Sequence, residues 1–341
     1  VRSVHQILAE PVPHIQIHTS PLEPRMCFKI CDRRCLAVLV FLVAVLSHLE
    51  SPSARGDANA VTIRVAAVSF RPKKFDLPGN ADKLEQIFRR AKQGGAKIAV
   101  APEGALDGYV VDDIITGQAA ESKMNKVAIS IDHSIIGRFQ ALGDELDICL
   151  VFGFAERIGD NVFNCALFID NKGKICGKYH KMQFAEGYDS SWWFNRLGLH
   201  SRAFDTPYGR CGIMICNDRW NPALAEIPVL DGAQFLLIPA FGSCSKSQDD
   251  AVLKRGQENN VPVIEANVGV TLIVNNNKIT AVDRQVEGIT FGEITIRPQT
   301  DAQPAKRDEV ERTFLAWREE EMQRRFNFRQ QHREMINNPK R

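Results

Sequence analysis

The chain has 341 residues and a net charge of +2, with 44% hydrophobic and 25% charged residues. These proportions are typical of a globular protein with a sizeable core, and they exclude a fibrous or largely disordered chain. Basic residues are spread among acidic ones, so the charge pattern predicts no nucleic-acid partner.

The first sixty residues differ from the rest. An uncharged apolar run at 35–46 follows the basic residues Arg33 and Arg34, and the stretch ends in Ala58-Asn59-Ala60. A basic segment, a short apolar run and small residues before the cut are typical of a secretory signal peptide. We predict that residues 1–60 form a leader cleaved after Ala60 and that the protein is exported, periplasmic or secreted. A membrane anchor that stays uncleaved is the alternative.

The nine cysteines suggest neither a disulfide framework nor a metal site. Cleavage would remove three of them, and the other six are scattered, with no Cys-x-x-Cys pair and no zinc-type Cys/His spacing.

After the leader, β-rich apolar runs alternate with segments of helical periodicity. We expect a domain over residues 61–297, followed by a linker and a charged C-terminal helix within 298–341. The first helix is expected to be capped by Asn80 and a later one by Ser247. The expected strands are 61–70, 97–101, 148–154, 162–170, 175–183, 212–215, 235–240, 261–266, 271–274, 279–282 and 288–296.

Cys216 lies at the end of the short apolar run Gly212–Ile215, which is typical of a buried parallel strand. Asn221 is placed to cap a following helix, with Pro222 at its first position. A thiol at such an elbow would lie at the carboxyl end of a sheet, near backbone N–H groups that favour thiolate. The pattern therefore indicates a nucleophile; the alternative is a buried cysteine that only fills space.

Two further residues follow strand ends. Glu103 comes just after the expected strand 97–101, where open α/β sheets expose functional groups, although a solvated loop carboxylate is the simpler interpretation. Alternation along 175–183 puts Lys181 on the same face as Tyr179. A buried ammonium needs a carboxylate nearby, and Glu186 follows; otherwise Lys181 extends to water.

The segment 186–198 is loop-like but rich in aromatic residues, among them Trp192 and Trp193. Such a loop would cover a substrate pocket or form a subunit interface, and both alternatives stay open.

Over about residues 61–296 the sequence resembles the nitrilase, or carbon-nitrogen hydrolase, superfamily. The motifs occur in the expected order. Ala101–Tyr109 resembles the family's Pro-Glu motif with its downstream Gly-Tyr, and Gly177–Lys181 resembles its Tyr-Arg-Lys motif. Ile215–Asp218 resembles its cysteine motif. Arg255–Asn259 and Ala266-Asn267 are similar to the Arg-Ala-x-Glu-Asn and Ala-Asn elements that come later in the family. His180, Met182 and Asp107 depart from the commoner residues at their positions.

The resemblance implies an α/β fold, a four-layer α-β-β-α sandwich, and assembly into a homo-oligomer. It assigns Cys216 as nucleophile, Glu103 as general base and Lys181 as the cation beside the reacting carbonyl oxygen, with Glu186 supporting the lysine. It also implies that neither a metal nor another cofactor is needed. The predicted substrate contacts are Asn217, Arg219 as the partner of a substrate carboxylate, Trp192 and Trp193.

The predicted function is hydrolysis of a non-peptide carbon-nitrogen bond, in a small-molecule amide or N-carbamoyl amide, through a cysteine thioester. Two alternatives stay open: a nitrilase acting on a nitrile, and an exported binding protein that keeps the fold without turnover. A papain-like enzyme with His180 or His200 as base is a third, without a supporting motif.

Overall fold

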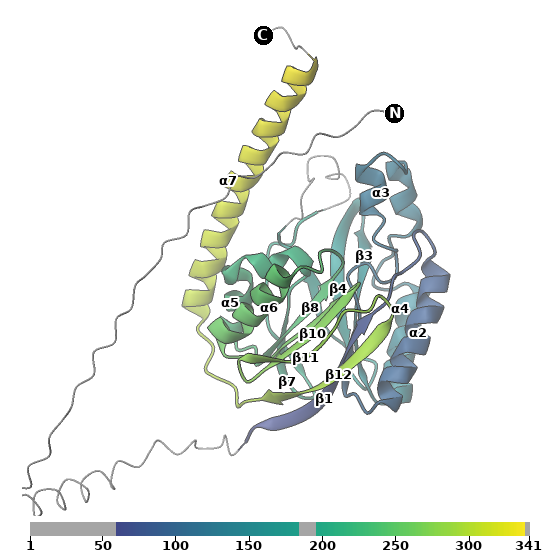
Figure 1. The fold of residues 1–341 in the computed structure, drawn as a ribbon, viewed down its shortest axis with the longest axis vertical. Coiled ribbons are helices and arrows are strands. Elements are labelled where there is room, and N and C mark those ends of the chain that lie inside the picture. The colour runs from purple at the N-terminus through teal and green to yellow at the C-terminus, as the bar shows by residue number, and fades with distance from the viewer. Residues whose placement is uncertain (1–58, 184–195, 338–341) are drawn as a thin grey trace, which may run out of the picture. The chain divides into compact units, whose positions relative to one another are not determined.

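The structure, a computed structural model, describes residues 59–183 and 196–337. Residues 1–58, which are nearly all of the predicted leader, and the segment 184–195 lie outside the described residues. Two six-stranded mixed sheets pack face to face, and helices cover their outer faces (Figure 1). The predicted α-β-β-α sandwich is confirmed.

The first sheet has the strand order β12-β1-β2-β3-β4-β5. Its central strands β1, β2 and β3 run parallel, while β12, β4 and β5 pair antiparallel with their neighbours. The strands are β1 (Val61–Ser69), β2 (Ile98–Val100), β3 (Cys149–Ile158), β4 (Asn161–Ile169), β5 (Ile175–His180) and β12 (Gly288–Ile296).

The second sheet has the order β11-β10-β9-β8-β7-β6, and its parallel strands are β7, β8 and β9. The strands are β6 (Phe204–Thr206), β7 (Gly209–Ile213), β8 (Phe235–Ala240), β9 (Val263–Asn267), β10 (Val270–Asn275) and β11 (Lys278–Asp283). Each sheet thus has a parallel centre whose strands end on loops, which is where α/β proteins place functional groups.

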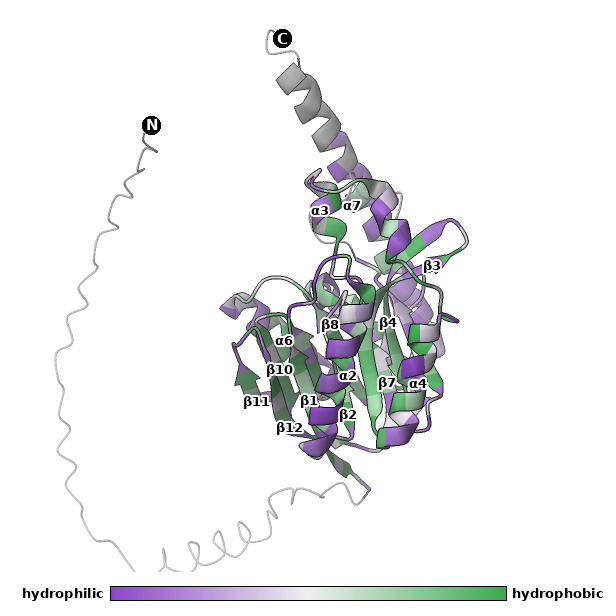
Figure 2. Ribbon diagram, turned by 90° about the vertical axis from the view of Figure 1, so that its right-hand side faces the viewer, coloured by the Kyte–Doolittle hydropathy of each residue, from purple (hydrophilic) through white to green (hydrophobic). Residues whose placement is uncertain are grey.

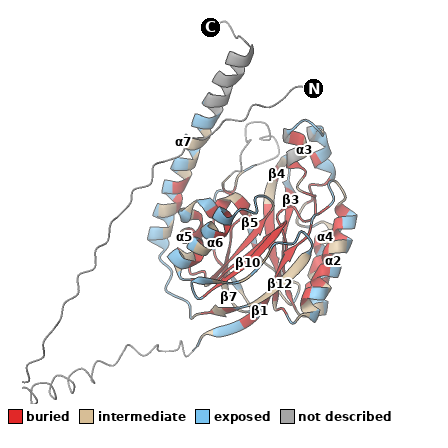
Figure 3. Cartoon of the chain, viewed as in Figure 1, coloured by how far each residue is buried: buried red, intermediate tan, exposed pale blue. Residues whose placement is uncertain are grey.

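Helices α2 and α4 cover the first sheet, and α5 and α6 cover the second (Figure 1). Their polar faces point outward and their apolar faces inward, as the hydropathy and burial colouring show (Figures 2 and 3). The helices are α2 (Leu77–Gln93), α3 (Val111–Ile115), α4 (Ser134–Leu146), α5 (Pro222–Leu230), α6 (Lys246–Asn259) and α7 (Pro304–Asn337), with short 3-10 helices η1 (Glu121–Lys126) and η3 (Cys216–Trp220).

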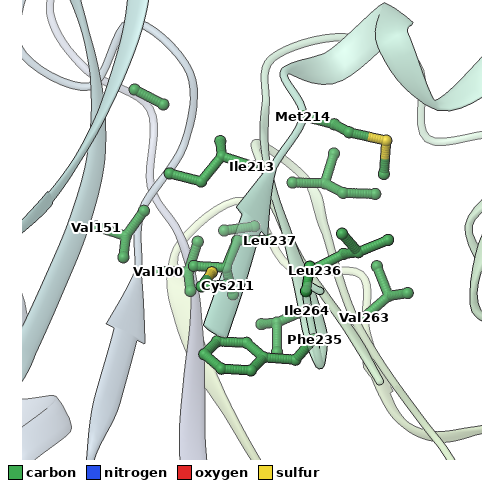
Figure 4. Packing of buried hydrophobic residues seen from close by; sticks show 14 of the residues in the cluster. Val100, Val151, Cys211, Ile213, Met214, Phe235, Leu236, Leu237, Val263 and Ile264 are labelled. Atoms are coloured by element: carbon green, nitrogen blue, oxygen red, sulfur yellow. The ribbon is translucent and has the colours of Figure 1, made fainter. Parts of the chain in front are cut away.

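The central core lies between the sheets. Strand alternation directs Ile213 and Leu237 of the second sheet toward Val100 and Val151 of the first, and Met214 to the opposite side (Figure 4). A second apolar cluster joins the first sheet to α2 and α4. The strand ends are therefore set on a close-packed layer that leaves little room for them to shift.

Two predicted helix caps are wrong. Asp76 caps α2, its carboxylate accepting from the N–H of Gly79 at 3.1 Å, because Pro78 suits the first turn of the helix. Asn80 is buried instead and its amide holds the loop before the helix by bonding Lys73. Helix α6 begins at Lys246 and follows Ser245, so Ser247 lies inside its first turn.

The C-terminal helix α7 packs on α5, with Phe314 buried against the central core. Within the described part of the chain, no helix combines the length and the apolar character that crossing a bilayer requires.

Candidate active site

Glu103, Lys181 and Cys216 each follow a strand end, of β2, β5 and β7 respectively. The Lys181 ammonium donates to Oε1 of Glu103 at 2.7 Å, and the two side chains are 3% and 0% exposed. The interpretations in which Glu103 is solvated and Lys181 extends to water are therefore wrong. Water is excluded from this ion pair, which strengthens the attraction between the two charges.

The Glu103 carboxylate is held at both oxygens. Asn164 donates its side-chain N–H to Oε1 at 2.6 Å, and the backbone N–H of Phe241 donates to Oε2 at 3.0 Å. The loop that carries Glu103 rests on Gly153 of β3, where a Cβ would lie 2.6 Å from the Cα of Glu103. Only glycine permits so close an approach at that point.

Cys216 occupies the elbow that the sequence predicts. Its φ of +50° lies in the left-handed region, which is costly for a residue with a side chain and persists only where surrounding contacts enforce it. The side chain is 7% exposed, and Sγ lies 3.8 Å from the carbonyl oxygen of Phe241. Phe241 therefore contacts both the thiol, through its C=O, and Glu103, through its N–H. Asn217 follows in the turn and is half-buried.

The charges around the thiol oppose one another. Burial, together with the negative charge of Glu103, raises the pKa of the Cys216 thiol, while Lys181 and Arg219 act to lower it. Burial, the largest single effect, acts to lower the pKa of Lys181, but the negative charges of Glu103, Cys216 and Asp218 together outweigh it and the pKa is raised. The resting thiol therefore keeps its proton until a base removes it, and Lys181 stays charged.

Asp218 ties the elbow to the strand that leads to Lys181. Its Oδ2 accepts from the N–H of Ile215 and from the hydroxyl of Tyr179, both at 2.8 Å, and its Oδ1 accepts from the N–H of Gln183 at 2.8 Å. Tyr179 and Gln183 flank Lys181 by two residues on either side. The carboxyl group thus fixes the lysine and the cysteine with respect to each other.

Of the other predicted site residues, the structure describes Arg219. Arg219 is 2% exposed; its guanidinium donates to Sγ of Cys216 at 3.3 Å and pairs with Glu265 of β9. Its charge is thus already matched by a protein carboxylate. Glu186, Trp192 and Trp193 lie outside the described residues, so their roles stay predictions.

Neither histidine named as an alternative base contacts the sulfur. His180 Nε2 lies 2.5 Å from Glu156, and its ring stacks on Phe163; His200 is held by Glu311 at 3.1 Å. Nothing in this arrangement supports a papain-like pair. The described cysteines are all free thiols.

Glu156, Cys165 and His180 form a group whose polar atoms lie within 4.8 Å of one another, a spacing that could suit a metal ion. However, the ammonium of Lys178 lies 2.7 Å from Glu156, and His180 holds its other oxygen. The carboxylate is therefore satisfied by protein donors, and a cation would have to displace an ammonium. The group fits a hydrogen-bonded cluster better than a metal site.

Sequence reasoning missed Asn164, Asp218, Phe241 and Gly153. Asn164 lies on β4 next to the end of β5, and the N–H of Lys181 donates to its carbonyl oxygen at 2.9 Å. The available signal was a polar residue in the middle of a strand whose neighbouring residues are apolar. Asp218 offered a similar signal, because it is a charged residue directly after the elbow. A carboxylate that becomes buried there needs hydrogen-bond donors.

An acid, an ammonium and a thiol thus follow strand ends of an α-β-β-α sandwich, which is the arrangement that the resemblance to the carbon-nitrogen hydrolases implies. The chain belongs to this family: the sequence model of the carbon-nitrogen hydrolase family matches residues 64–293.

Individual relatives agree with this assignment. The chain is 32% identical over 187 residues to a citrullinase of Francisella tularensis, covering 54% of this chain and 62% of that protein, less than two thirds of its length. It is 30% identical over 220 residues to an N-carbamoylputrescine amidase of Solanum tuberosum, covering 64% of this chain and 71% of that protein. The fold is similar to that of an amidase from Nesterenkonia sp. AN1, with a TM-score of 0.60, 18% identity, and coverage of 76% of this chain and 98% of that one.

Asp218→Asn is expected to lower the free energy of unfolding at pH 7 by about 1–3 kcal/mol and to reduce activity. An amide offers one acceptor oxygen, so its NH₂ group must face one of the three N–H or O–H donors that the carboxylate now accepts. Chemical denaturation checks this. Asp205→Asn, at an exposed ion pair with Arg210, is the control and should change stability by less than about 0.5 kcal/mol. Equal effects of the two substitutions would contradict the role given to Asp218.

Asp107 provides a pH-dependent test of burial. Its carboxyl accepts from the N–H of Ala155 at 3.0 Å, and burial raises its pKa from 3.8 to about 6. A raised pKa in the folded state means that the stabilisation is complete below about pH 4 and is lost as the pH rises through 6. Relative to Asp107→Asn, the native protein should therefore lose about 2–3 kcal/mol between pH 4 and pH 7. If the free energy of unfolding changed with pH in the same way for both proteins, the Asp107 carboxyl would ionise as readily in the folded protein as in the unfolded chain.

Proposed function

We propose that the protein hydrolyses a non-peptide carbon-nitrogen bond in an amide or N-carbamoyl amide through a thioester at Cys216. The observation that carries the proposal is the buried Glu103–Lys181 pair, set against a thiol on a strained elbow, with Phe241 contacting both the acid and the sulfur.

In the first half of the reaction, Glu103 takes the thiol proton and the sulfur attacks the carbonyl carbon. The carbonyl oxygen becomes an anion, which the Lys181 ammonium and the backbone N–H of Asn217 would stabilise more strongly than the neutral ground state. Collapse of this intermediate breaks the carbon-nitrogen bond. The proton returns from Glu103 to the leaving nitrogen, which departs as ammonia or an amine.

In the second half, water replaces the departed amine. Glu103 accepts a proton from the water, whose oxygen attacks the thioester carbon, and the sulfur leaves and regains a proton. The position of Glu103 suits both halves because Asn164 and Phe241 hold its two oxygens in one orientation. Every proton in this cycle is carried by a residue of the chain.

The choice among substrates rests on the relatives. The name of the Solanum relative is that of an amidase of an N-carbamoyl compound, which favours a carbamoyl or simple amide over a nitrile. A binding protein without turnover is disfavoured, because it would have no need to keep the acid, the ammonium and the thiol together in a buried site. Contacts of Asn217, Trp192, Trp193 and Glu186 with the substrate or with Lys181 stay predictions.

The deciding experiment is mass spectrometry of the protein incubated with a library of amides, carbamoyl compounds and nitriles. We expect an acyl or carbamoyl adduct on the peptide that contains Cys216, together with release of ammonia or an amine. Cys216→Ala should abolish both, and Glu103→Gln should lower turnover by about 100-fold or more, since general acid-base catalysis contributes that much. Ammonia release from nitriles alone would establish the nitrilase alternative.

Cys244→Ser is the matched control, because Cys244 is an exposed free thiol outside the proposed machinery. It should keep both the adduct and the activity. Turnover that survives in Cys216→Ala, in a protein with a normal unfolding transition, would refute the thioester.

Export is also proposed, on the basis of the basic and apolar pattern of residues 1–60. N-terminal sequencing of the mature protein should find a start at Val61; an intact leader would favour the membrane-anchored alternative. Assembly into a homo-oligomer is proposed from the family resemblance, and light scattering measures it.

A further inference from the structure

Arg219 lies three residues after the nucleophile, in the 3-10 turn η3. Residues i and i+3 are eclipsed in such a turn, so the side chains of Cys216 and Arg219 share one face. The result is a contact of 3.3 Å between the guanidinium Nη2 and the sulfur, with the arginine 2% exposed. A charge so close to the sulfur, and so far from water, acts on it strongly.

The guanidinium is held in this position by the second sheet and its helix. Glu265 of β9, which is 0% exposed, pairs with it, and Gln248 of α6 donates to Oε1 of Glu265 at 3.1 Å. Arg255 of α6 donates to the backbone carbonyl of Arg219 at 3.3 Å. Arg219 is therefore held by β9 and α6 of the second sheet, whereas Glu103 and Lys181 follow strands of the first.

The charged groups that face the sulfur can be assigned by element. Glu103 and Lys181 come from the ends of β2 and β5, while Arg219, and Asp218 beside Lys181, come from the turn of the nucleophile itself. When the thiol proton moves to Glu103, the electron pair stays on sulfur and two cations, Lys181 and Arg219, face the new negative charge. Lys181 must then also stabilise the oxyanion of the substrate, whereas Arg219 stabilises the negative charge on the sulfur alone.

We propose that Arg219 is a catalytic residue that donates an N–H···S hydrogen bond to the Cys216 thiolate, and that Glu265 is a positioning residue that limits the strength of this bond by sharing the guanidinium charge. The proposal rests on the proposed function only in taking Cys216 as the nucleophile. It differs from the sequence prediction that Arg219 binds a substrate carboxylate.

The test measures the rate of Cys216 alkylation by iodoacetamide as a function of pH, without substrate, by quantifying the modified Cys216 peptide. In Glu265→Gln the guanidinium charge is no longer shared with a carboxylate and acts on the sulfur alone. The midpoint of the curve of alkylation rate against pH should therefore move down by about one pH unit, so that below the midpoint alkylation is about tenfold faster than in the native protein. The double variant Arg219→Gln with Glu265→Gln leaves no unpaired buried charge and should move the midpoint up by a similar amount.

The matched control replaces another partly buried ion pair, Arg202 and Glu311, by glutamines. This pair does not touch the sulfur, so the midpoint should stay unchanged even if stability falls. Shifts of equal sign in Glu265→Gln and the double variant, or no shift in Glu265→Gln, would overturn the proposal. If the double variant does not fold, Glu265→Gln alone decides.

Two other outcomes are distinguishable. If Arg219 binds a substrate carboxylate instead, the double variant will raise KM for carboxylate-bearing substrates while the alkylation midpoint stays unchanged, which contradicts the thiolate role. If the proposed hydrolysis fails, no substrate will turn over, yet the opposite shifts of the midpoint can still be measured.

Discussion

The ion pair between Lys181 and Glu103 is the constraint on which the site depends. Both side chains are removed from water, and a buried charge without a partner would cost several kcal/mol. The strand ends that carry them must therefore converge to within hydrogen-bond distance. Asn164 and Phe241 satisfy the remaining positions of the carboxylate, so that it has one orientation only. Because the buried charges must be paired, the Glu103 carboxylate is also held in the one orientation from which it can act as a general base.

The turn after the nucleophile is anchored to both sheets. Asp218 reaches β5 of the first sheet through Tyr179, and Arg219 reaches β9 of the second through Glu265. Neighbouring residues in a tight turn point in different directions, so one short segment can make both connections. These anchors account for the positive φ of Cys216, because the contacts on either side outweigh the local strain.

Much of the fold was predictable because its elements depend on local patterns. The strand 235–240 and the helix cap at Asn221 were expected where they occur, since apolar runs and capping residues act over a few positions. The errors at Asn80 and Ser247 have a local cause as well. Several residues near each helix start are able to cap, and proline and tertiary contacts decide between them.

The sequence by itself determined the family, because four motifs resemble it in the expected order, and through that resemblance the layered fold and the three reactive groups; the strand ends, visible as apolar runs that stop, gave only their places. Only the tertiary structure decided which partners hold these groups. Asn164, Phe241 and Glu265 are remote in the chain from the residues that they contact, and no local pattern records such a contact. The direction of the Arg219 side chain was also decided by folding, since the eclipsed turn and a buried carboxylate, rather than its place in a motif, set where its charge lies.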